Sequence, residues 1–362
     1  MSLPYNNSID MTIQKWVGIV KTSLPEKLKP KTEDVIFIDV SKSKYLVPLN
    51  SDSTENDVVT NRKYLAQLFN QISANKNLVK YIFCDVKFDV ATIDDSLLIA
   101  STKLLDYKFL CINNYAGDSV QENLLKLRSA TATIDLQSGS VYKIPFFGKY
   151  HDTLVPYKIY YDLHQNKVTS NVLVTWFKNK GLSFNTQISD YPLRNKDFEE
   201  SGGYIKIGLG ELVSLVNINP NLFKDYLQNR FILIGDFEND VHSTYLNNQA
   251  GTLILFNAYW HLKKNKEILS FWYLLLLYVF LYIIAWLQVN KKSFSYIFNL
   301  KVKYFHKFQI PINILSISIL LIVFTCISSL VFEINISIFH LILIFSFIDI
   351  VKYFIDKFEN KK

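Results

Sequence analysis

A run of twenty residues without a charged side chain, residues 269–288 (LSFWYLLLLYVFLYIIAWLQ), constrains this chain more than any other feature. A helix of that length measures about 30 Å, which is the thickness of the hydrocarbon core of a bilayer. Aromatic residues lie near both ends of the run, where amphipathic rings prefer the lipid headgroups. The run therefore predicts a membrane-spanning helix.

Two further apolar runs follow the first. Residues 309–332 carry no charge until the run ends, and Pro311 lies in the first turn, where its missing N–H costs little. Residues 334–354 form a weaker run with His340 in the middle. An ionisable group inside a membrane is a functional candidate, so His340 is a candidate relay or partner contact; a neutral histidine bonded to the neighbouring span is the alternative. The runs predict three transmembrane helices over 269–288, 309–332 and 334–354.

The positions of the lysines predict an orientation. The segment between the first two runs and the C-terminal end are rich in lysine, whereas the turn between the second and third runs has none. Lysine and arginine concentrate on the cytoplasmic side of membrane proteins. We therefore expect a multi-pass protein of the cell inner (cytoplasmic) membrane. Its N-terminal domain is expected to be extracytoplasmic or periplasmic, and its C-terminus cytoplasmic.

The basic charge of the chain belongs mostly to the region of the apolar runs. Residues 269–362 contain nine lysines and four acidic residues, and so carry +5 of the formal net charge of +7. Such a distribution gives no reason to expect a nucleic-acid partner. The three cysteines are too few for a disulfide framework. Cys84 and Cys111 are interpreted as buried thiols, with a disulfide between them as the alternative.

Residues 1–30 contain apolar positions at helical spacing, interrupted by lysines, and lack the apolar core of a secretory signal. They predict a short amphipathic helix and a linker, with the helix packed on the domain or lying on a membrane surface. Export of the following domain would then require a preceding membrane segment, insertion through the first apolar run, or the opposite orientation.

Residues 31–265 alternate between strand-like and helix-like segments. A strand, a helix and a second strand in succession predict a right-handed parallel crossover. The expected strands cover 34–41, 79–89, 107–115 and 230–237, and the expected helices cover 61–73, 94–105, 153–164, 221–228 and 251–263. The predicted fold class is α/β, a domain with a mixed, mostly parallel sheet and flanking helices, followed by three transmembrane helices. The predicted domains are 1–30, 31–265 and 266–362.

The order of these segments resembles a known family. The resemblance is carried by DVIFIDVS, YIFCDVKFD, DDSLLIAST, DLQSGSVYKIPF and RFILIGDFENDVHSTYLNNQAGTLILFNAYWHL, followed by three apolar runs. This order resembles the type-2 CHASE domain, an extracytoplasmic sensory module of bacterial membrane receptors, over roughly residues 31–355 and most specifically over 232–262. The resemblance implies a sensor in bacterial signal transduction. Family members usually begin with a membrane helix and continue into an output domain; this chain shows neither, so we expect it to act without an output domain of its own.

Acidic residues follow the predicted strands. Asp39, Asp85 and Asp236 stand at or near strand ends, where ligands of open α/β sheets bind. Three converging carboxylates could hold Mg²⁺ or Ca²⁺; the alternative is that each one caps a helix or a turn. Asp240 and His242 lie just beyond the last of these strands. They could act as a ligand or as an acid/base pair; the alternative is a hydrogen bond that orders the loop. The sequence predicts a ligand site here and leaves a metal undecided.

The sequence lacks the nucleophile elbow, the phosphate-binding loop and the zinc motifs of common enzymes. It therefore predicts no enzyme and no cofactor, but a sensor or binding subunit. The expected partners are the membrane lipid bilayer, a membrane or envelope protein, and a second copy of the chain as a possible homo-oligomer. Two alternatives are an extracytoplasmic metal-dependent hydrolase and a purely structural anchor or assembly subunit of a membrane complex.

Overall fold

The computed structural model describes most of the chain. It covers residues 8–22, 29–48, 55–116, 119–121, 123–132, 141, 143–146, 153–165, 168–170, 174–177, 181–184, 186–188, 191–198, 203–266, 268–289, 309–332, 334, 347–348 and 351. The chain divides into two compact units. The α/β unit contains residues 25–166 and 189–264, and the helical unit contains residues 1–24, 167–188 and 265–362.

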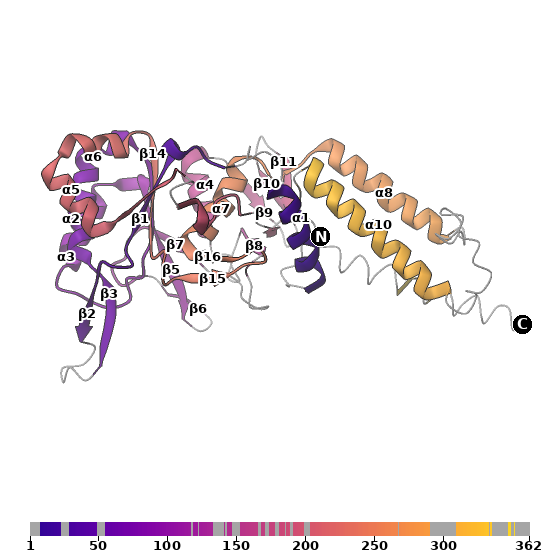
Figure 1. The fold of residues 1–362 in the computed structure, drawn as a ribbon, viewed down its shortest axis with the longest axis horizontal. Helices are drawn as coiled ribbons and strands as arrows, with labels where there is room; N and C mark the ends of the chain where they lie inside the picture. The colour runs from indigo at the N-terminus through magenta and orange to yellow at the C-terminus, as the bar shows by residue number, and fades with distance from the viewer. Residues whose placement is uncertain are drawn as a thin grey trace, which may run out of the picture. The chain divides into compact units, whose positions relative to one another are not determined.

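A seven-stranded sheet forms the centre of the α/β unit (Figure 1). Its strands follow the order β13-β1-β14-β4-β5-β6, and β7 also pairs with β5. Neighbouring strands run parallel, except that β6 is antiparallel to β5. The strands are β1 (Val35–Asp39), β4 (Val79–Asp85), β5 (Phe109–Ala116), β6 (Ser119–Gln121), β7 (Ser129–Thr131), β13 (Ile205–Gly208) and β14 (Arg230–Gly235). The predicted α/β class with a mostly parallel sheet is confirmed.

Helices cover both faces of this sheet (Figure 1). One face carries α2 (Arg62–Ala74), α3 (Asp95–Lys103), α5 (Leu209–Ile218) and α6 (Pro220–Leu227), and the other carries α4 (Val155–His164) and α7 (Gly251–Lys263). The sequence predicted α2, α3, α4, α6 and α7 within a few residues of these bounds. It did not predict α5.

The central strands are buried because both of their faces are apolar. All five residues of β1 are buried. Ile36 and Ile38 join the core beneath α2 and α5, whereas Phe37 points to the opposite face and packs edge-on against Phe237, with ring centroids 5.8 Å apart. A parallel strand covered on both faces is expected to consist of one continuous apolar run.

α7 is mostly apolar and is buried around its whole circumference, since residues 251–262 are all buried. A helix of this kind belongs inside a protein rather than on its surface. The ring of Phe256 lies 5.1 Å from that of Phe231 on β14, measured between centroids. This packing holds α7 against the sheet and places its first turn at the end of β14.

Short hairpins follow the central strands. After β1 come β2 (Lys44–Pro48) and β3 (Asn56–Thr60), which pair antiparallel. After β14 come β15 (Val241–Ser243) and β16 (Asn248–Ala250), also antiparallel, and the second of these leads directly into α7. The unit also contains β8 (Lys143–Pro145) and the short 3₁₀ helices η1 (Thr32–Asp34), η2 (Lys76–Leu78), η3 (Asp106–Lys108) and η4 (Asn195–Phe198).

The helical unit contains three helices and a small sheet within its described residues. The helices are α1 (Ser8–Thr22), α8 (Phe271–Val289) and α10 (Gln309–Val331). The sheet has the order β17-β11-β10-β9. Its strands are β9 (Val168–Ser170), β10 (Val174–Phe177), β11 (Gly181–Phe184) and β17 (Ile268–Leu269), and β12 (Thr186–Ile188) follows β11.

α8 and α10 pack on each other and on α1. The rings of Phe280 and Phe324 are stacked with centroids 4.1 Å apart, and the hydroxyl of Ser328 donates to that of Tyr273 across 3.1 Å. Ile13 and Val17 of α1 belong to the same apolar cluster. The predicted amphipathic N-terminal helix is therefore present, and its apolar face packs on the C-terminal helices.

The prediction of three transmembrane helices is wrong. A spanning helix needs about 20 consecutive residues that are predominantly apolar. Within the ranges the structure describes, no helix combines the length and the apolar character needed to cross a bilayer. α8 and α10, which lie over the runs 269–288 and 309–332, bury part of their apolar side chains against each other and α1. This finding also overturns the predicted multi-pass inner-membrane location, with its extracytoplasmic N-terminal domain and cytoplasmic C-terminus. Most of the third run, 334–354, lies outside the described residues.

The two cysteines of the sheet are neighbours. Cys84 of β4 is paired in register with Cys111 of β5, yet both are free and buried. Burial raises the pKa of Cys111 to about 12 and that of Cys84 well above its usual value. The interpretation as buried thiols is confirmed, and the alternative disulfide is not formed.

Candidate functional site

The connections of the sheet change direction at β14. The chain leaves β1 and β4 toward α2 and α3 on one face, whereas it leaves β14 through β15 and β16 toward α7 on the other face. Open α/β sheets bind ligands at the carboxyl ends of their strands, where neighbouring connections leave on opposite sides. Because β14 lies between β1 and β4, such an opening occurs on each side of it.

The predicted acidic residues lie along this edge. Asp39 and Asp85 are the last residues of β1 and β4, and both are in register with Gly235, the last residue of β14. Asp236 is the residue after it. The sequence thus placed all three carboxylates at the correct edge of the sheet. The structure divides them between the two sides of β14.

On the β1 side, Asp39 is buried and organises the backbone around it. Its Oδ1 accepts hydrogen bonds from the backbone N–H groups of Ser41 at 2.9 Å and Phe237 at 3.3 Å. Its Oδ2 lies 3.5 Å from Nζ of Lys206. These contacts agree with the alternative in which the carboxylate orders a loop.

Asp236 on the same side is bound by Lys44, which pairs with its Oδ2. Its Oδ1 accepts from the backbone N–H of Asn239 at 2.8 Å and of Glu238 at 3.1 Å. Burial acts to raise the pKa of Asp236, but the hydrogen bonds from Lys44 and Asn239 outweigh it, and the pKa is lowered. The carboxylate therefore stays ionised and paired.

On the β4 side, three side chains form what we call the carboxylate cluster: Asp85, Asp240 and His242. The hydroxyl of Thr252, in the first turn of α7, donates to Oδ2 of Asp85 across 2.8 Å. His242 Nε2 lies 3.0 Å from Oδ1 of Asp240. The β15–β16 hairpin brings this pair back to the start of α7, where the N–H of Gly251 donates to the backbone oxygen of Asp240 at 2.9 Å.

Two glycines make this arrangement possible. A Cβ atom on Gly235 would lie 1.9 Å from Oγ1 of Thr252, and one on Gly251 would lie 2.6 Å from Oδ2 of Asp240. Real Cβ atoms do not approach other atoms so closely, because the repulsion is too steep. Glycine at these positions therefore lets α7 and Asp240 come close to the sheet.

The carboxylate cluster titrates near neutral pH. Burial, together with the negative charge of Asp240, raises the pKa of Asp85 to about 7; the hydrogen bond from Thr252 and the charges of His242 and Lys87 oppose the rise. The hydrogen bond with Asp240 raises the pKa of His242, and burial opposes it. At neutral pH the cluster therefore contains a carboxyl, Asp85, that is partly protonated, beside a histidine whose pKa is raised by Asp240.

The described residues hold no group of three or more histidine, cysteine or acidic side chains arranged to bind a metal. Asp39, Asp85 and Asp236 are each engaged by different partners. The geometry therefore supports hydrogen-bonding or charge recognition at this edge. His340, the other candidate, lies outside the residues that the structure describes.

Sequence analysis missed Thr252, Gly235, Lys44 and Lys206. Thr252 had a local signal, because it is the second residue of a predicted helix. The two lysines had none, since each meets its carboxylate only through long-range strand pairing.

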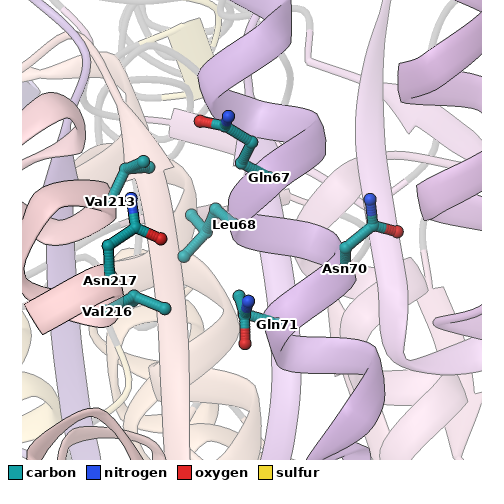
Figure 2. Close-up of a pocket in the computed structure, with 7 residues that line it drawn as sticks. All are labelled: Gln67, Leu68, Asn70, Gln71, Val213, Val216 and Asn217. Atoms are coloured by element: carbon teal, nitrogen blue, oxygen red, sulfur yellow. The ribbon is translucent and has the colours of Figure 1, made fainter. Parts of the chain in front are cut away.

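A separate groove lies between α2 and α5 (Figure 2). Its volume is about 250 Å³, and its lining combines aliphatic and amide side chains. The lining residues are Gln67, Leu68, Asn70, Gln71, Val213, Val216 and Asn217. None of these titrates, so the groove offers surface for recognition but no acid, base or nucleophile.

Comparison of the chain with known protein families, with characterised proteins and with solved structures finds no match. The resemblance to the type-2 CHASE domain therefore stays a prediction.

Proposed function

We propose that the α/β unit is a ligand-binding sensor module, and that it recognises a small molecule bearing a protonated amine at the carboxylate cluster. The observation that carries the proposal is the position of Asp85, Asp240 and His242 at the opening between β4 and β14, where the sheet connections diverge. The predicted CHASE-like order of segments is consistent with a sensory role. The groove between α2 and α5 has no charged lining and supports no comparable proposal.

The charges of the cluster favour an amine. Two carboxylates meet one histidine there, so an ammonium group can donate hydrogen bonds to both acids and reduce their mutual repulsion. The side chain of Asp240 is 46% exposed and that of His242 is 26% exposed, which leaves them accessible to a ligand. On the β1 side, by contrast, lysines already occupy the equivalent role.

Ligand binding at this point would act first on α7. Thr252 connects the first turn of α7 to Asp85, and Gly251 connects it to Asp240. An ammonium group beside Asp85 would favour the ionised carboxylate, whose proton would be released to solvent, and would change both contacts together. Such a change at one end of a buried helix would be the physical basis of the signal.

Calorimetric titration of the full chain with putrescine tests the proposal, with the uncharged analogue butanediol as the control ligand. We expect putrescine to bind and butanediol not to bind. Asp240→Asn is expected to weaken binding at least about tenfold, and binding is expected to be tighter at about pH 8 than at about pH 6, because Asp85 ionises between them. Lys44→Gln, on the β1 side, serves as the matched control and should leave the affinity unchanged.

Equal binding by wild type and Asp240→Asn would show that the cluster is not the recognition site. Failure of putrescine to bind at either pH would overturn the amine as the ligand class.

A further inference from the structure

Three lysine side chains meet at the end of the α/β unit opposite to the carboxylate cluster. Lys263 is the last residue of α7, Lys264 follows it, and Lys80 is the second residue of β4. Nζ of Lys263 is 4.0 Å from the centroid of the Trp260 ring, and Nζ of Lys264 is 5.3 Å from it. Lys80 lies close enough to Lys263 for its charge to lower the pKa of that side chain.

Helix-end electrostatics explains this group only in part. The carbonyl end of a helix attracts cations, which accounts for lysines at the end of α7. Lys80 belongs to a strand, and its contact with Lys263 brings two like charges together beside Trp260, a side chain only 4% exposed. Asp34 supplies an opposing charge to Lys263, which balances one of three ammonium groups. The group therefore carries excess positive charge.

The three lysines repel one another in the absence of a bound anion. Burial, followed by the charge of Lys80, lowers the pKa of Lys263 to about 8; Lys264 adds to this effect, and Asp34 opposes it. A bound anion would offset the repulsion among the three ammonium groups and raise the pKa of Lys263 again.

We propose that Lys80, Lys263 and Lys264 form a binding site for a phosphate group. A phosphate offers several acceptor oxygens and up to two negative charges, so it can accept hydrogen bonds from three ammonium groups at once. A carboxylate has two oxygens and one charge, and matches the group less well. Trp260 holds two of the ammonium groups over its face through cation–π contacts and so pre-arranges them. The site is separate from the carboxylate cluster and independent of the function proposed for it.

Calorimetric titration of the full chain at constant ionic strength, set with sodium chloride, tests the site. The probes are inorganic phosphate, glycerol phosphate as a monoester and dimethyl phosphate as a diester. We expect binding in wild type and a loss of at least about tenfold in Lys263→Gln and in Lys80→Gln. Lys224→Gln, an exposed lysine on α6, is the matched control and should bind as wild type does. The double variant of Lys80 and Lys263 should lose little more than either single variant, because both act on one ligand.

Trp260 provides a second measurement. Phosphate that draws the ammonium groups away from the indole of Trp260 should change the fluorescence of that side chain. Trp260→Phe should remove this fluorescence change, whereas calorimetry should still detect binding. Preference for phosphate and the monoester assigns the site to a terminal phosphate, and preference for dimethyl phosphate assigns it to a phosphodiester. Binding of none of the three probes, or an equal loss in Lys224→Gln, overturns the proposal.

Discussion

The two sides of β14 hold the same kind of side chain in different electrostatic states. On the β1 side, Asp39 and Asp236 each meet a lysine, and the pKa of Asp236 is lowered. On the β4 side, Asp85 is bound by a neutral hydroxyl and faces Asp240, and its pKa is raised to about 7. One side is therefore built of permanent ion pairs, and the other responds to protons and cations near neutral pH.

The difference arises from which element supplies the partner. β2 and β13 bring lysines to the β1 side, whereas the first turn of α7 brings Thr252 to the β4 side. A hydroxyl can donate to a carboxylate but cannot neutralise it. The same position at a strand end thus acquires either a structural or a responsive role through its neighbours.

Among the substitutions that test the difference between the two sides of β14, that of Gly235 should have the largest effect on stability. In Gly235→Ala the new methyl group would collide with Thr252, so α7 must move and the hydrogen bond to Asp85 is lost. We expect a loss of about 3 kcal/mol in the free energy of unfolding, measured by chemical denaturation. Gly208→Ala is the matched control, because there a Cβ would meet the flexible end of Glu211 at 3.3 Å. Equal losses in both variants would show that the contact between Gly235 and Thr252 is not the cause.

Removal of the Asp85 charge should change how the free energy of unfolding depends on pH, which tests the difference between the two sides of β14. The folded state binds a proton at Asp85 that the unfolded state releases, because the pKa is about 7 in the fold and 3.8 without it. The stability that this proton supplies is present at low pH and is lost as the pH rises toward about 7. Asp85→Asn should therefore match wild type near pH 4 and be about 2 kcal/mol more stable near pH 8.

Chemical denaturation at several pH values between about 4 and 8 measures this difference. Asparagine keeps an oxygen that can accept from Thr252, so the packing of α7 is retained. Asp236→Asn is the control for the same edge, since a group with a lowered pKa does not titrate in this window. A destabilised Asp85→Asn at about pH 8 would contradict the raised pKa.

Local patterns predicted much of this edge. α2 was predicted because Leu65, Leu68 and Ile72 recur at helical spacing, and all three are buried. The carboxylates were placed correctly because each follows an apolar strand within a few residues. Such features depend on neighbours in the sequence, which a single sequence displays.

Features that depend on distant partners were not predictable in the same way. The insertion of β14 between β1 and β4 joins segments nearly 200 residues apart, and it decides which carboxylates share a side. The contact of Gly235 with Thr252 depends on that insertion. The membrane prediction for the apolar runs 269–288 and 309–332 was wrong for a related reason. Hydrophobicity predicts that apolar side chains are buried, but it does not state what buries them.

The smallest expected effect concerns the β1 side. Asp236→Asn keeps an oxygen for the loop N–H groups but removes the charge that Lys44 binds. We expect a loss of about 1 kcal/mol near neutral pH. Because the pKa of Asp236 is lowered in the fold, this contribution is present above about pH 4 and disappears as the pH falls through the folded value, which is the opposite trend to that of Asp85.

A double-mutant cycle isolates the pair. Lys44→Gln and the combined variant, compared with Asp236→Asn by chemical denaturation near neutral pH, give the coupling between the two charges. A coupling near zero would mean that Asp236 acts through the backbone of Glu238 and Asn239 alone. The β1 side would then resemble the β4 side in lacking an effective counter-charge, and the contrast across β14 would rest on burial rather than on ion pairing.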